Sequence, residues 1–273
     1  MKTKLSAHLM KGYKMNYNEA KTEFIKRIKS IASKYSCHQV FSDFVEMSAI
    51  AISNRLNFDE KREQKYMDLQ SRYSKQEMDI IVSLLGLTVD ALSDKFGDFL
   101  GEVYMGMDSG NKNTGQFFTP YHVSKLCAKV TFDKEETLRA IEENGYVRLH
   151  EPTCGSCGMV IAWADVLKDN DINFQQSALA VVQDIDYRCV YMSYIQLSLI
   201  GMPAIVSAGN TLHMETYETL YTPMYMLGLW QYRTNKKYKD VVISEKETPT
   251  QTNNNDTVTE IISPTKELQL ALF

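Results

Sequence analysis

A glycine-rich pair of cysteines is the first feature of the chain that could do chemistry. The residues CGSCG, Cys154–Gly158, follow the apolar stretch YVRLHEP and precede the helix-like stretch MVIAWADVL. Glycine at 155 and 158 permits backbone conformations that other residues resist and lets a ligand approach the main chain. The free N–H groups at the start of the following helix attract an anionic group such as a carboxylate. The spacing therefore predicts a loop that cradles a small molecule.

A second polar group is placed to contact the same ligand. Asp184 ends the strand-like stretch ALAVVQDID, and a carboxylate at the end of a strand can accept hydrogen bonds from a ribose diol. It follows Gly155 by 29 residues, more than the roughly 20 of a dinucleotide fingerprint. The loop also lacks the G-x-G-x-x-G spacing and the lysine of a P-loop.

The cysteines allow other interpretations. Cys154 and Cys157 have the C-x-x-C spacing of a zinc site, with His150 and Cys189 as further ligands, but the chain has no second close pair. A redox pair is the second alternative, although no thioredoxin-like flank accompanies it. A tight turn without a ligand is the third. We expect no metal at this loop.

The surrounding stretches predict an α/β fold. Strand-like segments at 146–152, 178–186 and 203–209 alternate with helix-like segments at 159–169 and 187–201. This alternation predicts a partial Rossmann-like parallel sheet of about three strands, with the ligand at the carboxyl ends of the strands. We expect no clear fourth strand after Asn210, because METYETLY lacks an apolar pattern.

Three regions are expected along the chain: an N-terminal helical region at 1–110, a cofactor-binding domain at 111–232 and a disordered polar tail at 233–273. In the first, Phe24, Ile28, Ile31 and Tyr35 have helical spacing and are expected to form one apolar stripe.

The stretch FFTPYHVSKLCAKV predicts a helix that opens the second region. Thr119 is expected to cap this helix and Pro120 to begin it. Its buried face is expected to carry Val123, Leu126, Cys127 and Val130.

Composition limits the function classes. The chain has 273 residues, 44% of them hydrophobic, and a formal net charge of −4. It therefore lacks the basic footprint of a stand-alone DNA-binding protein, so a partner or a local patch would have to supply phosphate contacts. No apolar run is long enough for a membrane span, no signal peptide is evident, and the five cysteines fit a cytoplasmic protein with free thiols.

Four motifs occur in a fixed order: GQFFTP at 115–120, EPTCGSCG at 151–158, QDID at 183–186 and GNTL at 209–212. Together they resemble the adenine-N6 DNA methyltransferase family, especially the modification subunits of type I restriction systems. The stretch DKFGDFLGEVY at 94–104 resembles the segment before the F-T-P motif in that family. The resemblance covers about residues 90–212.

The resemblance implies that the ligand is S-adenosylmethionine. By this resemblance, the cofactor is covered by Phe118, Thr119 and Pro120, and its methionine part is held by Glu151, Pro152, Cys154, Gly155 and Ser156. Asp184 binds the ribose, and Ile185 and Asn210 contact the adenine ring. Two residues depart from the family pattern. Cys157 replaces a glycine, where a side chain could crowd the cofactor or resist a positive φ, and Asn210 replaces the common Asp.

The catalytic tetrapeptide of that family, Asn/Asp/Ser-Pro-Pro-aromatic, is absent, because no two of the six prolines are adjacent. In the family its polar groups accept the two N6 protons of a flipped-out adenine and its aromatic ring stacks on the base. The nearest match is TPMY, in which Thr222 would accept a proton and Tyr225 would stack. A structural turn that opens a helix explains this stretch equally well.

The last residues, QLALF, resemble the peptide by which bacterial repair and replication proteins bind the DNA sliding clamp. Gln269 would anchor by its amide, and Leu270, Leu272 and Phe273 would fill apolar pockets. The alternative is an apolar tail that folds back onto the domain.

Three hypotheses follow. The chain is an adenine-N6 methyltransferase, completed by Thr222 and Tyr225 or by a partner such as a methyltransferase or specificity subunit. Alternatively, it is a non-catalytic modulator or decoy that binds such a partner or the clamp. The third hypothesis is a small interaction protein with a vestigial pocket.

Overall fold

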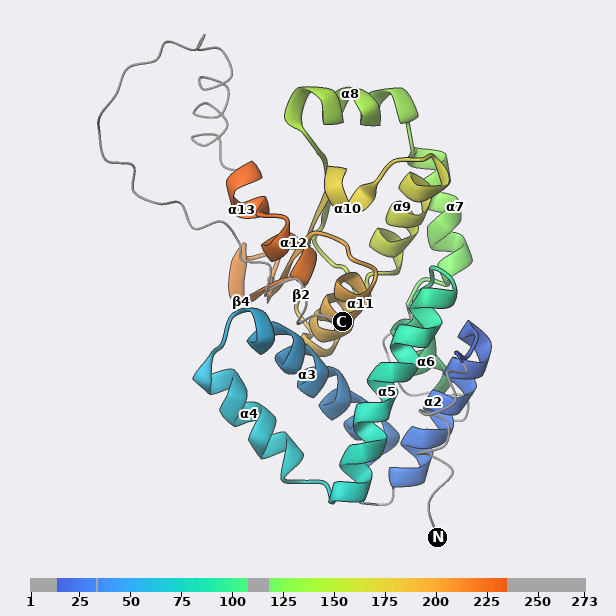
Figure 1. The fold of residues 1–273 in the computed structure, drawn as a ribbon, viewed down its shortest axis with the longest axis vertical. Helices are drawn as coiled ribbons and strands as arrows, with labels where there is room; N and C mark the ends of the chain where they lie inside the picture. The colour runs from blue at the N-terminus through green and yellow to red at the C-terminus, as the bar shows by residue number, and fades with distance from the viewer. Residues whose placement is uncertain (1–13, 33, 108–117, 235–273) are drawn as a thin grey trace, which may run out of the picture. The chain divides into compact units, whose positions relative to one another are not determined.

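The computed structural model describes residues 14–32, 34–107 and 118–234 (Figure 1). By its contacts the chain divides into two units, Met1–Thr234 and Asn235–Phe273, and the fold described here belongs to the first. Most of the predicted tail, the whole QLALF peptide and residues 115–117 of the GQFFTP motif lie outside the described residues.

The described part of the N-terminal region is helical. Its helices are α2 (Tyr17–Ile31), α3 (Cys37–Leu56), α4 (Glu60–Gln70), α5 (Lys75–Asp94) and α6 (Phe99–Met107). A capping box of Asn16 and Glu19 starts α2. Of the predicted stripe, Phe24, Ile28 and Ile31 are buried in this helix, whereas Tyr35 lies beyond its end. Among the described helices of the whole chain, none has the length and apolar character needed to cross a bilayer.

The second half of the described chain alternates between helices and strands. Its elements are α7 (Tyr121–Thr131), α8 (Lys134–Asn144), β1 (Val147–Glu151), α9 (Gly158–Asp169), α10 (Phe174–Ser177), β2 (Ala178–Asp184), α11 (Tyr187–Leu199), β3 (Ala204–Asn210), β4 (Glu215–Tyr221), α12 (Pro223–Leu227) and α13 (Trp230–Arg233). The sheet order is β1-β2-β3-β4, and the first three strands are parallel. The predicted fold class, a partial Rossmann-like sheet after a helical region, is confirmed.

Helices cover both faces of the sheet. Ala180, Val182 and Val206 face the main core, where α11 packs against β2 and β3 and also against α3 (Figure 1). Phe24 and Phe99 of the helical region belong to the same core. The helical region and the sheet therefore share one apolar interior.

The opposite face of the sheet is covered by the last described helices. Leu179 of β2 contacts a cluster with Tyr225 of α12 and Trp230 of α13, and Trp230 meets the ring of Tyr146 edge-on. Tyr225 is therefore part of the packing beneath the sheet.

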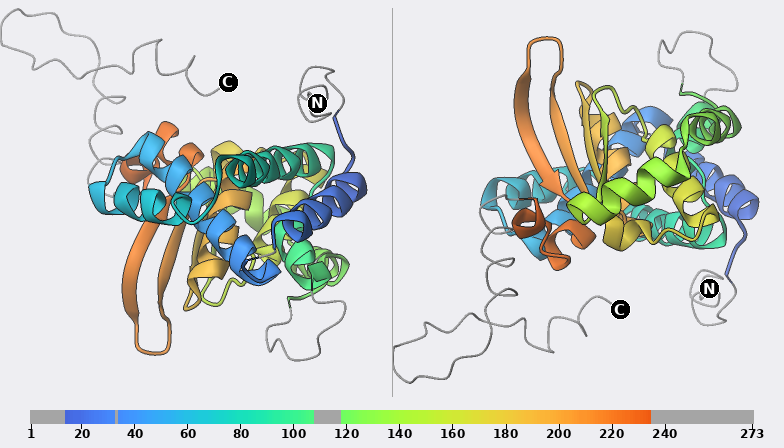
Figure 2. Two further views of the ribbon diagram at one scale, coloured as in Figure 1. Left: turned by 90° about the horizontal axis from the view of Figure 1, so that it is seen from below. Right: turned by 90° about the horizontal axis from the view of Figure 1, so that it is seen from above.

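The expectation that no fourth strand follows Asn210 is wrong. Residues Glu215–Tyr221 form β4, which pairs antiparallel with β3 from Asn210↔Glu215 to Ile205↔Tyr221. Figure 2 shows the two strands as a hairpin that reaches past the other strand ends. Because β4 is an edge strand and mostly exposed, it needs few apolar residues, and its sequence carries little strand signal.

The predicted buried face of the helix after the F-T-P motif is also wrong. Leu126 and Val130 are 61% and 77% exposed, Val123 and Cys127 are exposed as well, and the inward face carries Ser124 and Ala128. Ala128 packs against Ala162 and Val166 of α9. Polar contacts add to this packing: the Tyr121 hydroxyl donates to Asp165 at 2.9 Å, and the Lys125 ammonium lies 2.6 Å from the same carboxylate. Pro120, not Thr119, occupies the cap position.

Replacing Trp230 by alanine tests whether α13 holds the second face of the sheet. Trp230→Ala should lower the free energy of unfolding by about 3–5 kcal/mol, because the side chain is completely buried. Chemical denaturation measures the loss. Leu212→Ala at the 94% exposed hairpin turn is the control, and it should change stability by less than about 0.5 kcal/mol. Equal effects of the two changes would contradict this packing.

Candidate cofactor site

The carboxyl ends of the parallel strands bring the predicted cofactor segments together. In register, Glu151 of β1 pairs with Val182 of β2, and Asp184 pairs with Ala208 of β3. The CGSCG loop, Asp184 and Asn210 therefore lie along one edge of the sheet. This is the edge at which open α/β sheets bind ligands.

The loop presents its main chain rather than its side chains. The Cys154 N–H donates to the carbonyl of Gln183 at 2.9 Å, and the Cys157 N–H closes a turn to the Cys154 carbonyl at 2.8 Å. The side chains of Cys154, Ser156 and Cys157 are all buried. Ligand contacts from these predicted residues would therefore come from backbone groups.

Gly155 is required by its surroundings. Its φ is +54°, and a Cβ atom there would lie 3.2 Å from the ring of Phe118. That ring also meets Tyr104 at a centroid distance of 5.7 Å. The Phe of the F-T-P motif thus lies directly against the loop, whereas Thr119 and Pro120 are exposed beside it.

Cys157 adopts the conformation that a side chain usually resists. Its φ is +73° and ψ is +19°, in the left-handed region, and it immediately precedes α9. Its thiol is fully buried in the main core rather than directed to solvent. The replacement of glycine by cysteine therefore adds volume to the core.

The geometry does not favour metal or redox chemistry at the cysteines. Burial raises the pKa of the Cys157 thiol well above its usual value, and the Cys154 thiol raises that pKa further. A redox pair needs a reactive thiolate, which this environment disfavours. In residues 14–32, 34–107 and 118–234, no three His, Cys, Asp or Glu side chains are grouped to hold a metal ion.

Asp184 connects the loop to the second strand. One carboxylate oxygen accepts the Gly155 N–H at 2.8 Å, and the other accepts the Asp186 N–H at 2.9 Å. Each carboxylate oxygen has a second lone pair, so the half-buried group retains the capacity to accept from a diol. Ile185 beside it is 62% exposed and offers an apolar surface on the same edge.

Asn210 forms the turn of the β3–β4 hairpin. Its side-chain oxygen accepts the N–H groups of Leu212 at 3.1 Å and His213 at 3.3 Å. Since the oxygen is used in this turn, the amide nitrogen is the group that Asn210 offers to a ligand. The Thr211 hydroxyl donates to the Pro152 carbonyl at 2.6 Å and ties the hairpin to the loop. Glu151 accepts the Thr153 N–H at 3.3 Å in the same stretch.

The catalytic candidates Thr222 and Tyr225 lie at the other end of the sheet. Because β4 is antiparallel, Tyr221 pairs with Ile205 near the start of β3, roughly 17 Å from Asn210 at ~3.3 Å per residue. The buried Thr222 hydroxyl donates to the Met202 carbonyl at 2.7 Å and accepts the Ala204 N–H at 2.9 Å. This placement argues against the catalytic role that the sequence suggested and favours the structural turn.

Three buried polar residues lie behind the loop, and the sequence assigned none of them to the site individually. Asp98 accepts the Ser156 hydroxyl at 2.5 Å, Gln196 donates to the Ser156 carbonyl at 2.7 Å, and Ser193 donates to the Gly155 carbonyl at 2.9 Å. Two sequence signals point to them: Asp98 lies within the DKFGDFLGEVY stretch, and Ser193 and Gln196 are polar residues one turn apart on a mostly buried helix.

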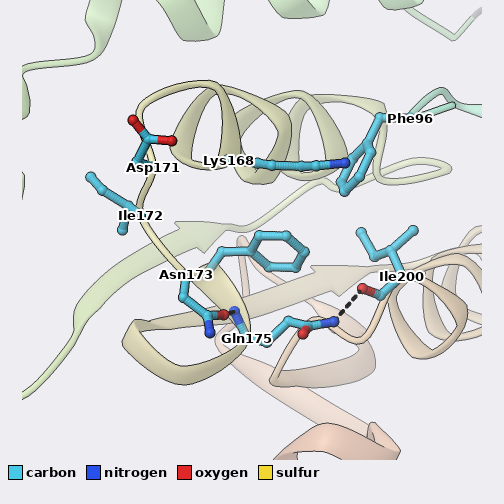
Figure 3. A pocket seen from close by; sticks show the side chains of 8 residues that line it. Phe96, Lys168, Asp171, Ile172, Asn173, Gln175 and Ile200 are labelled. Atoms are coloured by element: carbon cyan, nitrogen blue, oxygen red, sulfur yellow. Dashed lines mark hydrogen bonds between the residues drawn. The ribbon is translucent and has the colours of Figure 1, made fainter.

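A separate pocket of about 400 Å³ lies away from this edge (Figure 3). It is lined by Phe96, Lys168 and Phe174 among others, and contains none of the predicted cofactor residues. The Gln175 amide donates to the Ile200 carbonyl at 3.2 Å, as Figure 3 shows, so its polar group is already used within the protein.

Among known proteins, one family model matches the chain, and this match agrees with the sequence motifs. No curated protein matches the chain. Among solved structures, one similar chain is the type I restriction-modification methyltransferase subunit from Streptococcus thermophilus, with 19% identity and a TM-score of 0.39 over 71% of this chain and 40% of that one. Another is a Listeria monocytogenes protein described as a class I S-adenosylmethionine-dependent methyltransferase, with 11% identity and a TM-score of 0.37 over 80% and 71%.

The chain thus spans less than half of the length of the first of these proteins. The family model for N-6 DNA methylase matches residues 91–267, which is more than half of the chain. The chain belongs to the N-6 DNA methylase family.

Proposed function

We propose that this chain binds S-adenosylmethionine at the carboxyl edge of its sheet. The observation that supports this most is the hydrogen bond between Gly155 and Asp184, which joins a main-chain loop to a carboxylate across two strands. The methionine carboxylate suits the N-terminus of α9, which the loop leads into. The ribose suits Asp184, and the adenine ring suits the exposed side chain of Ile185.

Within this family, we propose that the chain takes part in methyl transfer to adenine N6 in DNA. Its contribution is the cofactor-binding site. The bound cofactor supplies the methyl group. The chain's own loop and Asp184 would hold and orient the cofactor. A second chain would supply the groups that accept the N6 protons, because Thr222 and Tyr225 lie at the opposite end of the sheet.

The same partner would supply most of the DNA contact. The net charge of −4 gives the chain little general attraction for phosphates. A specificity or methyltransferase subunit of a restriction-modification system fits this requirement.

A non-catalytic modulator is the second candidate function. The observation that favours it is the sequence itself, which has no adjacent prolines and hence no family tetrapeptide. Such a chain would bind the cofactor and a methyltransferase partner without completing a reaction.

Asp184→Ala should raise the dissociation constant for S-adenosylmethionine by about 5- to 150-fold, which corresponds to a lost hydrogen-bond partner of ~1–3 kcal/mol. Isothermal titration calorimetry measures the constant. Asp169→Ala, at the far end of α9, is the control and should bind as the wild type does. An unchanged constant for Asp184→Ala, or no binding by the wild type at millimolar cofactor, would refute the proposed site.

The second chain can be tested by methyl transfer from labelled S-adenosylmethionine to unmethylated DNA. With this chain alone, we expect no label on adenine. When type I modification and specificity subunits are added, we expect more label than these subunits give without the chain. Label with the chain alone would show that it carries its own acceptor groups. Intact cofactor binding without any increase in label would favour the modulator.

The C-terminal peptide remains a sequence prediction, since Gln269–Phe273 lie outside the described residues. Removing these five residues should abolish capture of the bacterial sliding clamp in a pull-down, because the glutamine and apolar anchors are lost. Substituting Ser263 by alanine is the control. Equal recovery of the clamp with and without Gln269–Phe273 would show that this peptide is not a clamp-binding site.

A further inference from the structure

Asp98 is a buried carboxylate that connects the helical region to the cofactor loop. It precedes α6 and is only 2% exposed. Within residues 14–32, 34–107 and 118–234, Asp98 forms no ion pair. A carboxylate without a cation in the interior is costly, so its hydrogen bonds have to compensate for the loss of water.

Those hydrogen bonds come from three different segments. The Ser156 hydroxyl of the loop donates at 2.5 Å, the Gln196 amide of α11 at 3.0 Å, and the Gly101 N–H of α6 at 3.1 Å. Burial raises the pKa of the Asp98 carboxyl group, whereas the bonds from Gln196 and Ser156 act in the opposite direction. The carboxylate is thus the point at which α6, α11 and the loop are joined.

Gln196 closes the same network from the other side. Its amide nitrogen also donates to the Ser156 carbonyl at 2.7 Å, and its amide oxygen accepts the Leu100 N–H at 3.0 Å. Ser156 is therefore held through both its side chain and its main chain. The residue lies between Gly155, which contacts Asp184, and Cys157, which precedes α9.

The backbone of α6 lies so close to the cofactor loop that side chains larger than that of glycine would meet Asp98 at two positions. A Cβ atom at Gly101 would collide with the Asp98 carboxylate and the Ser156 hydroxyl, and one at Gly158 would lie 3.2 Å from Asp98. The glycines at these positions let the backbone of α6 and of the loop enclose the carboxylate.

We propose that Asp98 is a positioning residue for the cofactor loop, so that the helical region is part of the cofactor site. It does not contact the cofactor but fixes Ser156, and through it the orientation of the Gly155–Cys157 main chain. The inference rests on the proposed cofactor site for its functional consequence. Its structural consequence, a loop ordered by a residue 58 positions away in the sequence, can be measured without any ligand.

The test compares Asp98→Ala with Asp43→Ala, a matched control. Asp43 is also a buried carboxylate of the helical region, and it accepts from Gln39 at 2.7 Å, Arg72 at 3.2 Å and Tyr73 at 2.7 Å, but it does not contact the loop. Both variants should unfold at a lower temperature. Only Asp98→Ala should accelerate hydrogen exchange in the peptide 153–158, and only it should raise the dissociation constant for S-adenosylmethionine, by about tenfold.

Two further variants complete the test. Asp98→Asn keeps the size of the side chain, and its amide can donate to the Ser156 hydroxyl while its oxygen accepts from Gly101 and Gln196. It should restore loop exchange and binding to within about threefold of the wild type. Ser156→Ala removes the hydrogen bond between Ser156 and Asp98 from the loop side. It replaces Asp98→Ala in the same measurements if Asp98→Ala does not fold.

The outcomes separate this inference from the proposed function. Loop exchange and cofactor affinity that respond equally to Asp43→Ala and Asp98→Ala would overturn the positioning role, as would Asp98→Asn behaving like Asp98→Ala. If the wild type binds no S-adenosylmethionine, the proposed function fails, but faster loop exchange confined to Asp98→Ala and Ser156→Ala would still support the positioning role.

Discussion

The hydrogen bond from the Gly155 N–H to the Asp184 carboxylate is the constraint around which the site is organised. It joins the loop after β1 to the end of β2, at the sheet edge where the strand register also brings Asn210. In the loop that makes this bond, Gly155 has a positive φ and the side chains of Cys154, Ser156 and Cys157 are buried. The loop leads directly into α9, whose first N–H groups suit an anionic part of a ligand, while the Asp184 carboxylate suits a diol.

Local patterns in the sequence were sufficient for this part of the fold. Apolar strand segments and helical stripes are set by burial on one or both faces, so the three parallel strands and the loop between β1 and α9 could be predicted. The positions of Asp184 and Ile185 at the sheet edge follow from the same pattern. The match of residues 91–267 to the N-6 DNA methylase family agrees with the order of the four motifs.

The features that sequence reasoning missed depend on contacts between distant segments or on exposure. An exposed edge strand such as β4 needs no apolar alternation, so Glu215–Tyr221 looked irregular. Its antiparallel direction then carries Thr222 and Tyr225 away from the site, which no local pattern reveals. In α7 the inward face is made of Ser124, Ala128 and the polar contacts to Asp165, so the apolar stripe identified the wrong face. Asp98 and Gln196 meet across 98 residues, and their pairing is visible only in the structure.

A crystal structure of the chain soaked with S-adenosylmethionine tests the central claim most directly. We expect the ribose hydroxyls to lie within hydrogen-bond distance of the Asp184 carboxylate and the methionine carboxylate to contact the main chain of residues 155–158. Density for the cofactor at another place, or a cradle closed by the Phe118 ring with no cofactor bound, would contradict it.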